Sequence, residues 1–155
     1  MLFINYRMVL DTLQALFRRD LERLRNEIDA YRSEEQIWAV DGQIPNSAGN
    51  LCLHLVGNLN TYIGAELGKT GYVRDRPAEF ALKGITKAVL INQVEQTIAV
   101  VEQTLRQLDD QQLEQAYPIV VLNEPTTTGF LLIHLATHLG YHLGQINYHR
   151  RLLDQ

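Results

Sequence analysis

The chain has 155 residues, of which 46% are hydrophobic and 21% charged, and its net charge is −4 with histidine neutral. This length suits one domain with its own core, over residues 1–155, and the hydrophobic content is too high for a disordered chain. The acidic balance argues against a nucleic-acid partner, because a protein that binds phosphates presents a basic face. The single cysteine, Cys52, can form no internal disulfide, so we expect a reducing, cytoplasmic environment.

An amphipathic pattern begins near the start of the chain. Large apolar residues recur every three or four positions from Leu10 to Ile28, and arginine and glutamate occupy the opposite face. This spacing is typical of one apolar stripe on an α-helix, so we predict a first helix over residues 6–31. A short helical turn is predicted to follow over residues 33–36.

Three further long helices are predicted from the same periodicity, over residues 47–70, 86–108 and 129–153. A chain with four long helices and no internal repeat is most simply an all-α protein that folds as a four-helix bundle. The three connections are longer than is usual in such a bundle, which permits a crossover connection in place of simple up-and-down hairpins.

The connections are predicted from their composition. Residues 71–77 have the composition of a loop, residues 109–113 that of a short helical turn, and residues 117–122 favour an extended segment. The stretch 125–149 has no Asp, Glu, Lys or Arg and is long enough to cross a bilayer. Its histidine, threonine, asparagine and glutamine side chains are costly in lipid, so we expect no membrane span.

All five histidines lie on two of the predicted helices. They are His54 on the second helix and His134, His138, His142 and His149 on the fourth. At 100° per residue, the four on the fourth helix share an arc of about 80° with Gln145. Imidazole is a usual ligand of Zn, Ni, Cu and Fe(II), and two histidines four residues apart can bind one ion with a third ligand from a facing helix. His54 is the candidate for that third ligand.

The spacing alone leaves the ligand pair open. If the second and fourth helices run parallel, His54 lies level with His134. If they run antiparallel, His54 faces His138, His142 or His149. Histidines outside the ligand pair need another role. His134 either lines the mouth of a site or is a hydrogen-bonded core residue. His149 precedes two arginines at the helix end, where it would complement the helix dipole.

Other polar residues lie near these histidines on the predicted helices. Asn58 follows His54 by one helical turn, and Gln145 shares the arc of the fourth helix, so either could hydrogen-bond to the outer nitrogen of a ligand. Cys52 points away from His54 and is predicted to be a small buried apolar residue. Residues 74–76, Arg-Asp-Arg, are interpreted as a salt-bridge cluster of the loop, with an anionic substrate as the alternative ligand.

Two segments of the sequence resemble the DinB-like superfamily of small bacterial four-helix bundles, many of which are regarded as metal-dependent enzymes. Residues 53–59, LHLVGNL, hold one histidine, and residues 138–146, HLGYHLGQI, hold the pattern His-x-x-x-His-x-Gly-Gln. Residues 73–80 resemble one uncharacterised branch of the superfamily. The resemblance covers nearly the whole chain.

The resemblance implies a fold and a site. The fold is a bundle with up-down-down-up order, in which the second and fourth helices are antiparallel. The implied metal ligands are His54, His138 and His142. The characterised relatives are thiol S-transferases and thiol-dependent isomerases that act with low-molecular-weight thiols.

A three-histidine site has a definite chemistry. Three neutral imidazoles leave the charge of a divalent ion, Zn or Ni for preference, uncompensated and at least one coordination position open. Such an ion lowers the pKa of a bound thiol or water. We therefore predict a metal-dependent transferase or hydrolase with a small-molecule substrate; the motif supplies no carboxylate as a general base. The alternative is a bundle that binds a metal or small ligand without catalysis.

Charge also suggests an assembly. The fourth helix has no charged residue before Arg150, and the second has none over residues 47–65. The solvent-facing side of a bundle helix is normally charged, so a helix without charged residues is expected to be buried on all sides. We predict a two-fold symmetric homodimer in which the second and fourth helices contribute to the interface.

Overall fold

The computed structural model describes residues 7–155, which form helices. The longer helices are α1 (Arg7–Asp29), α2 (Ala48–Leu59), α4 (Lys87–Gln107) and α6 (Thr128–Leu153). The shorter ones are the 3-10 helix η1 (Glu35–Trp38), the π-helix η2 (Asn60–Ala65), α3 (Arg76–Ala81) and α5 (Asp110–Glu114). Within residues 7–155 the only β-type pairing is an isolated antiparallel bridge between Ala116 and Thr127. The all-α class predicted from the sequence is therefore confirmed.

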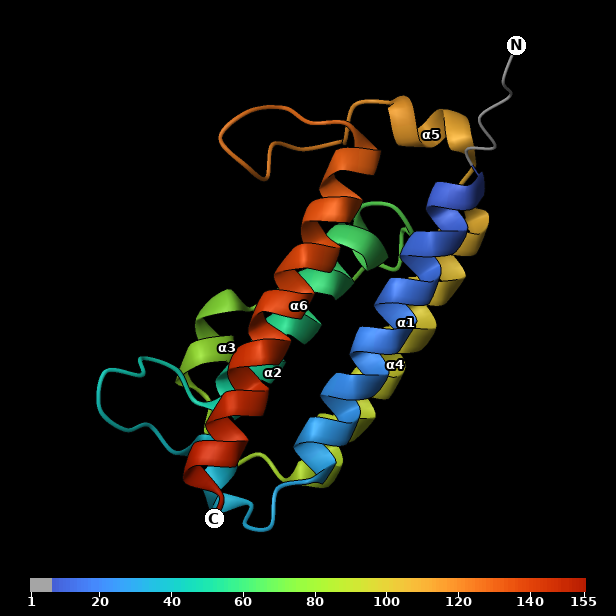
Figure 1. Ribbon diagram of the computed structural model, residues 1–155. Coiled ribbons are helices and arrows are strands. Elements are labelled where there is room, and N and C mark those ends of the chain that lie inside the picture. The colour runs from blue at the N-terminus through green and yellow to red at the C-terminus, as the bar shows by residue number, and fades with distance from the viewer. Residues whose placement is uncertain (1–6) are drawn as a thin grey trace.

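The four longer helices lie side by side (Figure 1). α1 packs against α4 and α6, and α2 packs against the same two helices. In Figure 1, α1 and α6 run downward, whereas α2 and α4 run upward. Side-chain contacts agree with this direction, because Leu51 lies near Gln145 while Tyr62 accepts a hydrogen bond from Tyr117. The second and fourth predicted helices are thus antiparallel.

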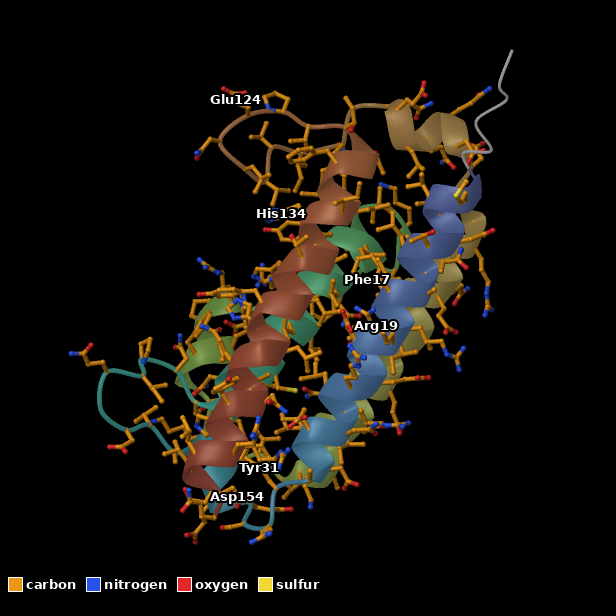
Figure 2. All side chains as sticks on the ribbon, viewed as in Figure 1. Phe17, Arg19, Tyr31, Glu124, His134 and Asp154 are labelled. Carbon is orange, nitrogen blue, oxygen red and sulfur yellow. The ribbon has the colours of Figure 1, made fainter. Side chains whose placement is uncertain are left out.

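The core follows the apolar stripe that the sequence predicts for α1. Its inward residues are all buried; they are Leu10, Leu13, Phe17, Leu21, Leu24 and Ile28. Each such side chain contributes about 1.5–3 kcal/mol by leaving water. Phe17, labelled in Figure 2, comes from the middle of this stripe. The outward face carries ion pairs instead, such as that of Arg18 with Glu22 at 3.0 Å.

Helix starts agree closely with the sequence prediction. Ser47, Thr86 and Thr127 each accept a hydrogen bond from the backbone N–H three residues further on, which is the usual N-cap arrangement. The predicted start of the first helix at Tyr6 lies outside the described residues. The predicted helix over residues 47–70 is α2 followed by the π-helix η2, and it ends at Ala65, before the predicted end.

The extended segment predicted over residues 117–122 is wrong. These residues form an irregular loop, closed at its base by the bridge between Ala116 and Thr127. Strand-forming residues need a neighbouring strand to pair with, and the described residues offer none here. Tyr117 is buried instead, and its hydroxyl donates to the carbonyl of Tyr62 at 2.6 Å. Among residues 7–155, no helix combines the length and apolar character that crossing a membrane requires.

Candidate metal centre

Three histidines converge between α2 and α6. His138 Nε2 lies 3.2 Å from His54 Nε2 and 3.1 Å from His142 Nε2. One ring nitrogen from each of the three lies within 4.8 Å of the others. Tetrahedral ligands about 2.0–2.1 Å from a zinc ion are about 3.3 Å apart, so these nitrogens have the spacing of a ligand set.

In two of the rings, a hydrogen bond at the outer nitrogen determines which ring nitrogen carries the proton. His142 Nδ1 lies 2.6 Å from the amide oxygen of Gln145, and His54 Nδ1 lies 3.1 Å from Oε2 of Glu79. Both oxygens accept hydrogen bonds, so each Nδ1 donates its proton outward. The lone pairs on Nε2 of His54 and His142 are then free to bind a shared ion. The suggestion that Gln145 supports a ligand is consistent with this contact.

The third ring, His138, has no such outer partner. Among residues 7–155, its Nδ1 is buried without a hydrogen-bond partner, and so is Oδ1 of Asn58. Burial, together with the neighbouring His142 and His54, lowers the pKa of His138 to about 4. Burial also lowers the pKa of His54, although Glu79 opposes that shift. Both rings are therefore neutral at neutral pH, the form that binds a metal.

A short helix, α3, brings an acidic residue to the cluster. The sequence prediction assigns its first residues to a loop, yet two signals of a helix start are present. The Asp75 side chain accepts from the backbone N–H of Ala78, and a proline lies in the first turn. The Asn50 amide of α2 donates to the carbonyls of Glu79 and Leu82 at 2.9 and 2.8 Å, which fixes α3 against α2.

Glu79 is buried and forms a two-point ion pair. Arg74 Nε lies 2.6 Å from Oε1 of Glu79, and Arg74 Nη2 lies 2.9 Å from Oε2. A Cβ atom at Gly57 would overlap Oε1, so a glycine on α2 makes the room that this carboxylate occupies. The sequence motif holds no carboxylate, but the fold brings one to the histidines from outside the motif, because Glu79 contacts His54 directly. Arg74 pairs with Glu79, five residues further on, rather than within the 74–76 cluster.

His134 lies beside the three histidines without joining them. Its ring stacks on that of His138, with centroids 6.3 Å apart and planes at 22°, and it is half-buried. It lies one turn above His138 on α6 (Figure 2).

His149 is placed differently from the prediction. It is buried, its Nε2 lies 2.8 Å from the carbonyl of Ala39, and its Nδ1 lies 2.7 Å from the hydroxyl of Tyr31. The carbonyl accepts the Nε2 proton, so Nδ1 accepts from Tyr31, which is labelled near the C-terminal end of α6 in Figure 2. The ring therefore joins α6 to the segment that follows α1, at Tyr31 and Ala39, a structural role that does not depend on the helix dipole.

We expect Tyr31→Phe to lower the free energy of unfolding by about 1–3 kcal/mol, because it leaves the buried Nδ1 of His149 without a donor. Urea unfolding followed by circular dichroism measures the change. Tyr148→Phe is the control, since Tyr148 is exposed on the same helix. Equal unfolding midpoints for Tyr31→Phe and the wild type would show that this hydrogen bond does not contribute.

Fold and site together define a class: an all-helical protein in which three histidines from two antiparallel helices converge. The chain belongs to the family described as "Protein of unknown function (DUF1572)", whose model matches residues 6–155. No curated protein matches it. It is similar to a solved structure, "Crystal structure of the conserved protein of locus from Enterococcus faecalis", with a TM-score of 0.71 and 19% identity over 92% of this chain and 95% of that chain. At that identity the likeness shows the fold alone.

Proposed function

We propose that this protein is a metal-dependent enzyme that holds one divalent ion, Zn or Ni, with His54, His138 and His142. One observation carries the proposal: the outer nitrogens of two rings donate to fixed oxygens, so their inner lone pairs meet beside His138 Nε2. A hydrogen-bonded core cluster would have paired each of these inner nitrogens with its own donor atom, whereas both face the single nitrogen Nε2 of His138. Three lone pairs at this separation are instead the donor set of a cation.

The same proposal extends to the fold family. We propose a DinB-like four-helix bundle with up-down-down-up order and a crossover connection. The support is the direction of the helices, with α1 and α6 opposite to α2 and α4 (Figure 1). The buried free thiol of Cys52, whose pKa burial raises to about 12, is compatible with a cytoplasmic protein.

The chemistry we propose is thiol transfer to an electrophile. A divalent ion at the site supplies Lewis acidity, which lowers the pKa of a thiol or water. In the proposed transfer the thiol of a low-molecular-weight substrate would lose its proton to solvent and its sulfur would bond to an electrophilic carbon. A halide would leave that carbon as the anion, or an epoxide oxygen would leave it and take up a proton from solvent. The protein ligands are uncharged, and Arg74 balances the charge of Glu79. The charge of the ion is thus available to the thiolate.

The neighbouring rings shape the site. Phe80 lies 5.2 Å from the ring of His54, and Tyr141 lies 5.2 Å from that of His142, centroid to centroid. Both are at least partly exposed, so aromatic surface borders the cluster. Apolar surroundings limit access of water to a metal site and strengthen its electrostatics.

Two measurements test the proposed function. Elemental analysis of protein purified without a His-tag should find one equivalent of a divalent metal. Protein reloaded with Zn or Ni should then be screened with bacterial low-molecular-weight thiols against epoxide and halide electrophiles. We expect turnover above the metal-free control. Stoichiometric metal without turnover across the screen would favour the alternative, a metal- or small-ligand-binding bundle.

We further propose that the protein is a homodimer, with a second copy covering the outer face of α6. That helix has no charged residue before Arg150. It nevertheless exposes a line of large apolar side chains, namely Phe130, Ile133, Tyr141, Tyr148 and Leu152. A self-complementary surface of this kind suits a two-fold axis, because each copy offers the same stripe to the other.

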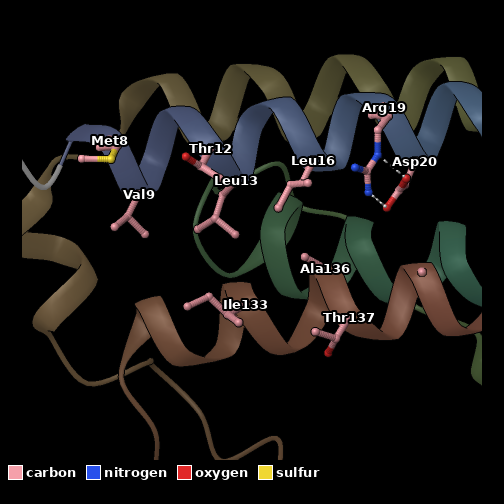
Figure 3. A pocket seen from close by; sticks show the side chains of 11 residues that line it. Met8, Val9, Thr12, Leu13, Leu16, Arg19, Asp20, Ile133, Ala136 and Thr137 are labelled. Atoms are coloured by element: carbon pink, nitrogen blue, oxygen red, sulfur yellow. Dashed lines mark hydrogen bonds and ion pairs between the residues drawn. The ribbon is translucent and has the colours of Figure 1, made fainter.

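The surface beside α6 supports this choice of partner. A groove of about 470 Å³ lies between α1 and α6, with Leu13 and Leu16 on one side and Ile133 and Ala136 on the other (Figure 3). The apolar line on α6 of one copy would fill the groove of the other. The predicted contribution of α2 needs revision, because every residue of α2 except Val56 is buried within the chain.

We expect Gly140→Arg to shift the protein from dimer to monomer in sedimentation velocity. A Cβ at Gly140 meets no atom within 4 Å, so the variant can fold while placing a charge in the groove that Gly140 lines, where the second copy would dock. Gln103→Arg, which adds the same charge on the exposed face of α4, is the control. A wild-type protein that sediments as a monomer at micromolar concentration would contradict the dimer.

A further inference from the structure

We infer that Arg74 and Glu79 act together as a clamp that holds His54 in the orientation required for metal binding. This inference rests on the proposed function, since it assigns a role to two residues behind one of the three ligands. It also explains why α3 and the loop before it are folded against α2 at this position.

The contacts define the proton of His54. Its Nδ1 lies 3.1 Å from Oε2 of Glu79 and 3.3 Å from Nη2 of Arg74. The guanidinium can only donate, and the carboxylate can only accept. The nearer contact, to the carboxylate, makes Nδ1 the protonated nitrogen and leaves the lone pair on Nε2. A histidine that binds a metal commonly donates its other N–H to a carboxylate, which orients the ring and raises its basicity.

Arg74 then fixes the carboxylate itself. Its Nε and Nη2 bind the two oxygens of Glu79 separately, so the carboxylate cannot rotate away from His54. The arginine side chain is 13% exposed and that of Glu79 7%, which removes both from the screening of solvent. The guanidinium also lies 5.7 Å from the centre of the Tyr62 ring, a cation–π contact that holds it from the other side.

The backbone of α2 is adapted to this pair. Residue 57 lies three positions after His54, and any side chain there would overlap Oε1 of Glu79. Asn50 binds both carbonyls at the end of α3, so Glu79 is positioned from α2 as well. A salt bridge that only closed the loop would require neither a glycine at position 57 of α2 nor contact with His54.

The other two ligands are held less firmly. Gln145, which backs His142, is an exposed neutral residue on the same helix, and the outer nitrogen of His138 has no partner. His54 is therefore the ligand whose orientation the protein fixes from outside, and binding of the metal is coupled to the docking of α3.

Titration with Co²⁺, followed by competition with Zn²⁺, tests the clamp. We expect Glu79→Gln to weaken binding by about 10- to 100-fold and to change the visible spectrum of bound Co²⁺, which reports ligand geometry. Glu79→Gln leaves Arg74 buried without its partner and is prone to unfold. The double variant Arg74→Met/Glu79→Gln carries no unpaired charge and should show the same loss.

Gly57→Ala tests the same clamp without altering either residue of the pair. Its new Cβ displaces the carboxylate, so we expect weaker Co²⁺ binding and a changed spectrum. Gly64→Ala is the matched control for crowding, since its Cβ would press on Val100, away from the site. Gly144→Ala, whose Cβ meets no atom within 4 Å, is the control for a glycine beside the ligands. Both controls should bind Co²⁺ as the wild type does.

The outcomes separate this inference from the proposed function. Wild-type protein that binds no metal would overturn both. Wild-type binding with affinity and spectrum unchanged in the double variant and in Gly57→Ala would overturn the clamp alone. An equal loss in Gly64→Ala would also overturn it, because the effect would then follow from general destabilisation.

Discussion

Replacing His138 with alanine is expected to abolish stoichiometric binding of a divalent ion. His138 Nε2 is the nitrogen that lies near both of the others, at 3.2 Å from His54 Nε2 and 3.1 Å from His142 Nε2. Its loss leaves two nitrogens from different helices, which cannot close a three-ligand site. The effect should exceed the loss of about 10- to 100-fold that is typical of an outer partner. Equilibrium dialysis with elemental analysis measures the bound metal.

The matched control is His134→Ala, one turn away on the same helix. His134 stacks on His138 but lies outside the converging set, so we expect metal affinity within a few-fold of the wild type. Alanine favours a helix, so neither variant should disrupt α6. If His138→Ala keeps one equivalent of metal with unchanged affinity, the assignment of the ligands is wrong.

The long helices and two of the three proposed ligands could be predicted from local periodicity. The stripe of α1 and the pair His138 and His142 repeat every three or four residues, and this spacing alone places them on one face. The partner of that pair could not be read in this way. His54 faces His138 rather than His134 because α2 and α6 are antiparallel, a property of the chain's path between helices.

Glu79 was missed for a different reason. It is 25 residues from His54, on a helix too short to show a periodic pattern. Asp75 followed by Pro77 is the usual beginning of a helix and could have revealed α3. Gly57 was a second signal. A glycine inside a helix lowers the stability of that helix, so its presence there suggests that another group approaches the backbone closely. Neither signal names the approaching residue, which only the packing of α3 on α2 determines.

Charge patterning was misleading for α2, and the interface that it predicts for α6 stays a prediction. α2 lacks charge because α3, α4 and α6 cover it, so its composition reflects burial within the chain. α6 lacks charge as well, but five of its large apolar residues remain exposed. The same composition therefore has two causes, and burial distinguishes them.

Arg74→Met is expected to lower the free energy of unfolding of the metal-free protein by about 3 kcal/mol. The substitution leaves the carboxylate of Glu79 buried without an opposite charge, and breaking one side of a buried ion pair has costs of this order. The 7% exposure of the Glu79 side chain leaves little room for water to replace the guanidinium. Urea unfolding at neutral pH, followed by circular dichroism, measures the difference.

Two further variants show whether the unpaired charge is the cause. Arg74→Met/Glu79→Gln removes both charges, and a neutral pair of similar volume is often as stable as a buried ion pair, so most of the lost stability should return. Arg18→Met breaks an ion pair whose arginine side chain is 57% exposed, and it should change stability far less. If the double variant is as unstable as Arg74→Met, the lost free energy of unfolding comes from the packing of the arginine side chain against Tyr62, and not from its charge.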